Sequence, residues 1–167
     1  MAITRTPMVD DDGSGTTGTI INNAWKQEFY GQIDGLVGTW VDMPYAAGNF
    51  TATDGATWNV QPGNIAVHRY AIVAQTMRVH LSVAASEVLG TPALLVLALP
   101  AGYSIAASFL SPIIVNDAAT GNIAAYLFGN PPENHVSLKK LSGANWLATS
   151  AGAGTDVFVT VAFEVRP

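Results

Sequence analysis

From Thr39 to Pro167 the sequence is built from short apolar runs separated by turn residues, and it carries almost no charge. Only 12 of these 129 residues are Asp, Glu, Lys or Arg. An ordinary globular domain is about 25% charged. Soluble β domains normally use charge to stay in solution and to protect the edges of their sheets. A chain with so little charge is expected to cover much of its surface with copies of itself or with other subunits.

Alternating hydrophobicity predicts an all-β fold after Trp40. Apolar residues recur at every second position over 77–83 and 157–165, as expected for half-buried antiparallel strands. Turn signals such as Asp54-Gly55, Pro62-Gly63 and Asn130-Pro131-Pro132 separate these strands from others. We expect a β-sandwich or jelly roll of about 8–10 strands. The other strands are expected at 39–43, 56–60, 65–73, 93–99, 104–109, 113–116, 122–128 and 135–141.

The first 38 residues differ from the rest and are expected to form an assembly element of their own. Residues 1–18 are a polar, glycine-rich extended arm, and 19–36 have the pattern of one short helix. Its apolar stripe repeats every four residues and consists of Ile21, Trp25, Phe29 and Ile33. This stripe either packs on the chain's own β domain, 39–167, or bundles with symmetry-related copies.

A hairpin formed by 65–73 and 76–84 is expected to carry a basic stripe. If the turn is Ala74-Gln75, facing residue numbers sum to 149, so Arg69 lies opposite His80 and Ala71 lies opposite Arg78. Tyr70 and Ile72 then face the core. Three interpretations stay open for Arg69, Arg78 and His80: a solvated outer face, a subunit contact, or a site for a carboxylate, a glycan or an acidic loop.

Several classes of partner are disfavoured by composition. The formal net charge is −5 and the pI is about 4.9, so the protein is negatively charged at neutral pH. A negative surface repels phosphate backbones, and no nucleic-acid partner is therefore expected. The most apolar run, 93–99, is far shorter than the ~20 residues that span a bilayer, so no membrane partner is expected either. The chain has no cysteine, which excludes disulfides and thiolate metal sites.

No motif in the sequence predicts catalysis or a cofactor. The glycines of 13–18 match G-x-G-x-x-G, but they follow three aspartates and no βαβ pattern comes after them. The oxygen-bearing side chains at residues 10, 12 and 14 resemble the first ligands of a calcium-binding loop. The last ligand of such a loop is a glutamate, and the corresponding residue here is Ile21. The histidines are far apart in sequence. We therefore expect no catalytic, cofactor or metal site, and predict that the protein is not an enzyme.

Two stretches resemble structural proteins of tailed-bacteriophage virions. The segment TPMVDDDGSGTTGTIINNAWKQEFYGQID, residues 6–34, resembles a leader of such proteins. The segment GNFTATDGATWNV, residues 48–60, followed by 70–83, resembles a β module of phage fibre and surface proteins. The resemblance implies a virion location, a β-sandwich head and a homo-oligomer, commonly a trimer. It carries no functional residue over to this chain.

Two functions follow from these observations. The first is a capsid decoration or cement protein that acts through contacts with its own copies and with other virion proteins. The second is a short tail-fibre or receptor-binding protein that recognises host glycans. Glycan recognition favours long loops rich in aromatic and polar residues, whereas the loops here are short and rich in Ala and Gly. The sequence therefore favours the structural role.

Overall fold

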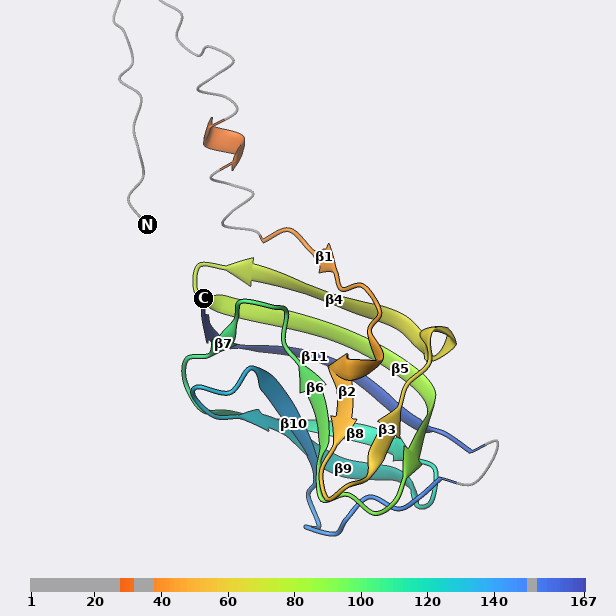
Figure 1. Ribbon diagram of the computed structural model, residues 1–167. Helices are drawn as coiled ribbons and strands as arrows, with labels where there is room; N and C mark the ends of the chain where they lie inside the picture. The colour runs from red at the N-terminus through yellow and green to blue at the C-terminus, as the bar shows by residue number, and fades with distance from the viewer. Residues whose placement is uncertain (1–27, 32–37, 150–152) are drawn as a thin grey trace, which may run out of the picture. The chain divides into compact units, whose positions relative to one another are not determined.

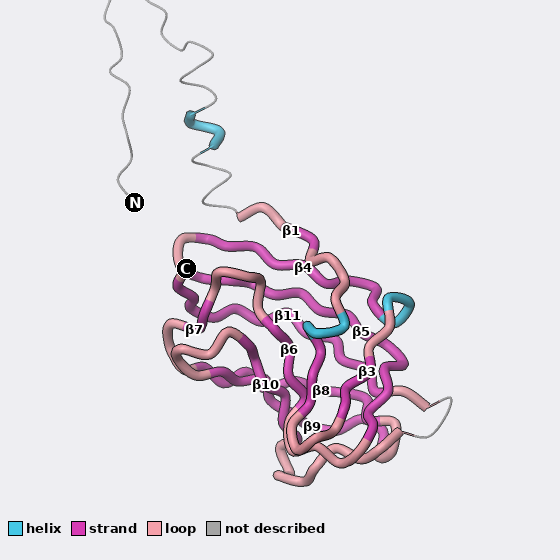
Figure 2. Tube along the Cα trace, in the orientation of Figure 1, coloured by secondary structure: helices cyan, strands magenta, loops and turns pink. Residues whose placement is uncertain are grey.

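The computed structural model describes residues 28–31, 38–149 and 153–167, and its fold is all-β (Figures 1 and 2). This confirms the fold class expected from the alternating pattern. The strands are β1 (Val41–Asp42), β2 (Phe50–Ala52), β3 (Thr57–Asn59), β4 (Ile65–Val73), β5 (Thr76–Leu89), β6 (Leu95–Ala98), β7 (Ser104–Ile105), β8 (Phe109–Asp117), β9 (Gly121–Gly129), β10 (His135–Lys140) and β11 (Thr155–Arg166). Two short 3-10 helices, Ala47–Asn49 and Pro62–Asn64, lie between strands.

The chain divides into two compact units, Met1–Thr39 and Trp40–Pro167. In the first unit the structure describes one helical turn at 28–31, together with residues 38 and 39. No helix among the described residues has the length and hydropathy needed to cross a membrane.

Every strand pair in the second unit is antiparallel, and the strands form one curled sheet (Figure 1). The hydrogen-bonded order is β1-β4-β5-β11-β8-β9-β10-β6-β2, with β3 added to β5 and β7 added to β11. The turn after β2 leads into β3, which pairs with β5, so this segment of the chain joins the last strand of the path to β5. A jelly-roll connectivity stays a prediction.

The predicted β4–β5 hairpin has the expected register. Arg69 pairs with His80, Tyr70 with Val79 and Ala71 with Arg78, and the numbering shifts only at a bulge between Ile65 and Val67. The turn contains Ala74 with a φ of 55°. A left-handed alanine is uncommon because its Cβ crowds the following carbonyl. The turn therefore lacks the usual sequence motif, and the sequence does not predict its type.

The core lies inside the curl, and the long strands β5 and β11 supply much of it. Every second residue of β11 from Thr155 to Val165 is buried, and the residues between them are half-buried or exposed. On the facing strand Met77 and Val83 are fully buried. Phe50 and Trp58 meet edge to face, with ring centres 5.4 Å apart and planes at 89°. Such a contact adds to the stabilisation by burial.

Four strands differ most from the sequence prediction. β5 extends to Leu89 instead of residue 84, and β7 ends at Ile105 instead of residue 109. β2 was not predicted, because its three residues are too few to show a period of two. β8 begins at Phe109 instead of residue 113 and includes Pro112. Proline has no N–H to donate, and near Pro112 only β9 pairs with β8, since the β11 pairing covers only Val115 and Asn116. An interior proline is tolerated there because few ladder hydrogen bonds depend on it.

Candidate functional site

The basic stripe exists and includes an aromatic residue that the sequence did not assign to it. Arg69 Nη2 lies 3.4 Å from His80 Nδ1, and the Arg69 guanidinium carbon lies 4.7 Å from the centre of the Trp40 ring. Trp40 also meets His80 at 6.2 Å between ring centres. Arg69 is thus held over an aromatic ring, a contact that stabilises a cation. We use the name basic stripe for Trp40, Arg69, Arg78 and His80.

The arginines of the basic stripe form no salt bridge within the described part of the chain, although Asp42 of β1 lies opposite Arg69. Across β11, His80 faces Thr160 and the exposed Arg78 faces Ala162, both uncharged. Neither Arg69 nor Arg78 forms a salt bridge to a described carboxylate. The Nε of Arg69 is buried and has no hydrogen-bond partner among the described residues. Two guanidinium groups are therefore available to an acidic partner on an otherwise nearly neutral sheet.

The helical candidates are placed only in part. Ile21, Trp25 and Ile33 lie outside the described residues. Phe29 lies in the helical turn at 28–31, where 46% of its surface is exposed and its ring centre is 6.2 Å from that of Tyr30. The role of this stripe in assembly stays a prediction.

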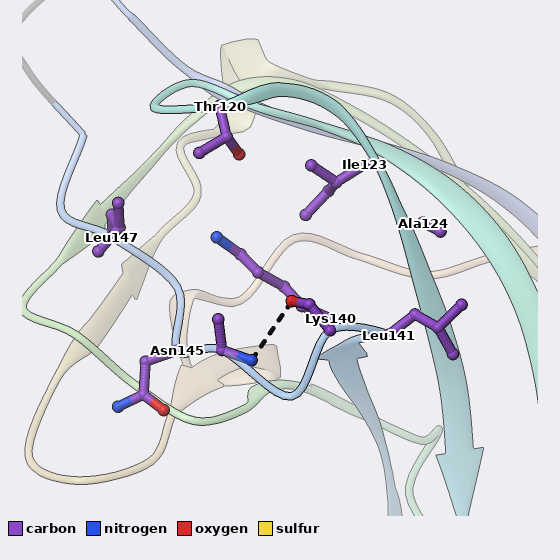
Figure 3. A pocket seen from close by; sticks show the side chains of 9 residues that line it. Thr120, Ile123, Ala124, Lys140, Leu141, Asn145 and Leu147 are labelled. Atoms are coloured by element: carbon purple, nitrogen blue, oxygen red, sulfur yellow. Dashed lines mark hydrogen bonds between the residues drawn. The ribbon is translucent and has the colours of Figure 1, made fainter.

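A pocket of about 620 Å³ opens where β9 begins and β10 ends (Figure 3). Its walls are largely apolar and include Ile123, Ala124, Leu141 and Leu147. Figure 3 shows the amine of Lys140 reaching across it between Thr120 and Leu147. Most ligand pockets combine apolar walls with a few polar groups. Here, however, the only charged side chain in the wall already has a partner.

That partner is Asp117, which forms a buried ion pair with Lys140. Asp117 also accepts hydrogen bonds from the Ala119 N–H at 3.2 Å and from Thr120 Oγ1 at 2.8 Å. Burial opposes ionisation of this carboxyl, but the bonds from Lys140, Ala119 and Thr120 together hold the pKa of Asp117 below its usual value. The amine of Lys140 lies 5.2 Å from the Trp146 ring centre. The pair therefore fixes the turn after β8 against β10, which is a structural role.

The other carboxylates likewise hold loops in place. Asp54 Oδ2 accepts from the Ala93 N–H at 2.9 Å, and this bond, followed by one from Thr53, lowers the pKa of Asp54. Asp156 Oδ1 accepts from the Ala85 N–H at 2.6 Å. Glu133 Oε2 accepts from the Asn130 N–H at 2.9 Å. These three carboxylates therefore bind backbone amides of neighbouring turns.

The histidines do not combine into a site. Within the described ranges no group of three or more His, Cys, Asp or Glu residues is placed to hold a metal ion. His68 is 5% exposed, packs 5.5 Å from the Phe50 ring centre, and neither of its ring nitrogens has a described partner. Burial lowers the pKa of His68, so its neutral form is favoured. Such a histidine is part of the core.

A second cleft, of about 430 Å³, lies beside β1. Tyr45 and Tyr70 both line it, together with Asn49 and the turn at 99–101. The hydroxyl of Tyr45 donates to the Val60 carbonyl at 2.9 Å, which fixes its ring at the cleft. The side chain of Asn49 makes no hydrogen bond to a described residue. The cleft therefore offers ring surface together with a free amide.

Sequence reasoning found Arg69, Arg78 and His80 but missed Trp40 as their neighbour. Residue 40 was expected at the start of a strand, and β1 does begin at Val41, but no residue pattern tells which strand it joins. The pairing of Val41 with Tyr70 and of Asp42 with Arg69 brings Trp40 to the stripe. No family model, no curated protein and no solved structure matches this chain.

Proposed function

We propose that this protein is a non-enzymatic structural subunit on the surface of a phage particle, of the capsid decoration or cement type. It acts through contacts with copies of itself and with other virion proteins, and its location is the virion. The virion assignment is supported by the resemblance of 6–34, 48–60 and 70–83 to phage structural proteins. The mode of action is supported by the surface of the β unit.

The basic stripe is the observation that carries the proposal. Arg69 is positioned over Trp40 and beside His80, while Arg78 projects from the neighbouring strand with no described counter-ion. A cluster of positive charge on a chain with a net charge of −5 dominates its local field and favours an acidic partner. An exposed sheet face with such a cluster is suited to binding a second protein.

The double variant Arg69→Ala, Arg78→Ala tests this contact. It should weaken attachment of the protein to the particle, and raising the salt concentration should weaken wild-type attachment in the same way, because salt screens exposed charges. A matched control, Lys139→Ala with Arg166→Ala, removes the same charge away from the stripe and should leave attachment near the wild-type level. Unchanged attachment in the first variant, or equal loss in the control, contradicts the proposal.

The non-enzymatic part of the proposal is supported by the roles of the carboxylates. Asp54, Asp117, Asp156 and Glu133 are each held by backbone amides. Turnover of a cell-wall glycan by the purified protein would overturn it.

A second candidate function is that of a short tail-fibre or receptor-binding protein that recognises host glycans. The cleft lined by Tyr45, Tyr70 and Asn49 favours it, because aromatic rings stack on the apolar faces of sugars while amides bind hydroxyl groups. Titration with saccharides, followed by NMR, tests it. Binding that is lost in Tyr45→Ala but kept in Tyr45→Phe supports stacking on this ring, and no shift with any saccharide rejects this function.

A further inference from the structure

The outward face of β8, β9 and the start of β11 is strongly apolar. Leu110 is 66% exposed, Ile114 is 70% exposed and Phe158 is 56% exposed. We use the name apolar face for the outward residues Leu110, Pro112, Ile114, Tyr126, Phe128 and Phe158.

Strand register makes these residues neighbours. Leu110 pairs with Phe128 and Pro112 pairs with Tyr126 across β8 and β9. The rings of Tyr126 and Phe128 are 5.5 Å apart between centres. On the other side of β8, Val157 pairs with Val115, so Phe158 is next to Ile114 on the adjacent strand. The side chains therefore form one continuous surface over three strands.

No charge lies within the apolar face, and Lys139 of β10, which pairs with Tyr126, borders it. None of the outward residues of β8 between 110 and 116, nor of β9 between 122 and 128, is charged. Asp156 lies at the border of the face, and its carboxylate accepts hydrogen bonds from Asn116 Nδ2 at 2.9 Å and from the Ala85 N–H. Monomeric soluble proteins rarely expose continuous apolar patches larger than a few hundred Å². This face is therefore expected to be covered.

The apolar face is large enough to form the centre of a protein interface. Nine-residue strands are about 30 Å long, and β11, β8 and β9 side by side are about 14 Å wide, which gives roughly 400 Å² in plan. A standard interface covers about 800 Å² of each partner. The face supplies about half of that area by itself, without any contribution from loops.

We infer that a second copy of this chain covers the apolar face. Copies of an uncharged surface can meet around a symmetry axis without opposing like charges, and interfaces between identical subunits are the most apolar and most depleted in charge. The inference rests on the proposed function, since it names the surface through which the subunit contacts its copies. The basic stripe remains for other partners.

A charge-insertion variant tests the inference by solution mass. Leu110→Lys with Ile114→Lys places two cations on the face and should raise the dissociation constant for self-association by roughly a hundredfold, because an unpaired buried charge is strongly unfavourable at an interface. The control Val41→Lys with Leu89→Lys adds the same charge at positions that are 46% and 45% exposed but lie elsewhere. It should assemble like wild type. Circular dichroism verifies that both variants are folded.

Labelling of a single introduced cysteine gives a second readout, because the chain has no cysteine of its own. In the assembled protein, a maleimide should react with Ile114→Cys at least tenfold more slowly than with Leu89→Cys. Equal rates mean that the face is open or is reserved for another molecule, and they overturn the inference. If wild type assembles and the Leu110→Lys, Ile114→Lys variant assembles equally well, the inference is overturned, but the proposed function is not. Monomeric wild type overturns the self-contact in the proposed function as well.

Discussion

His68 is the clearest example of a single residue whose surroundings set its behaviour. It lies on the core side of β4 opposite Leu81, and both ring nitrogens lack a described partner. The unfolded chain protonates this imidazole near its ordinary pKa of about 6.5. Burial keeps the folded pKa lower, so the unfolded state binds more protons below that pH. His68 therefore makes stability fall as the pH drops from about 6.5 towards the lowered folded pKa.

We predict that His68→Leu removes this pH dependence. The variant should raise the free energy of unfolding by about 1–2 kcal/mol at pH 5, since it no longer buries polar nitrogens without partners. The gain should be smaller at pH 7.5, where wild-type His68 is neutral in both states. Urea unfolding of both proteins at the two pH values measures it. Equal gains at both pH values, or a loss at pH 5, would show that protonation of His68 is not coupled to folding.

At the scale of the element, strand alternation located most strands, but it did not determine their partners. β11 was predicted almost to the residue because its apolar positions alternate, whereas β4 was located as an apolar segment after the Pro62-Gly63 turn. The placement of Arg69, Arg78 and His80 followed from the hairpin register alone, but that of Trp40 did not. The pairing of β1 with β4, the ion pair of Asp117 with Lys140 and the apolar face arise from contacts between segments distant in sequence. Such contacts depend on tertiary packing, which a local pattern does not contain.

The turn between β4 and β5 provides a test at this scale. Ala74 has a φ of 55°, where an L-residue is disfavoured by roughly 1–2 kcal/mol. Ala74→Gly should remove this backbone strain. Because glycine also loses more chain entropy on folding, the net increase in the free energy of unfolding should be about 0.5–1 kcal/mol. Ala66→Gly, in β4 at a residue without positive φ, should lower it by a similar amount. Denaturant melts compare them, and destabilisation by both changes would rule out backbone relief at Ala74.

For the whole molecule, the shortage of charge, the basic stripe and the apolar face all indicate a subunit that acts through contacts with other subunits. The basic stripe and the apolar face project outward from different strands of one curled sheet. The core inside the curl is filled by alternating residues of β5 and β11, so the outer side is left for contacts with other subunits. A subunit of this kind should be stable only as part of an assembly, because the interfaces of obligate oligomers are large and apolar.

The mass of the wild-type particle in solution tests this account most directly. Light scattering at micromolar concentration should give a multiple of the 17.4 kDa chain mass, and three chains per particle is the number that the phage resemblance implies. Raising the salt concentration should leave this mass unchanged, since apolar contacts are not screened. A particle of 17.4 kDa at micromolar concentration would contradict the account, because the apolar face would then be exposed to water in a stable monomer.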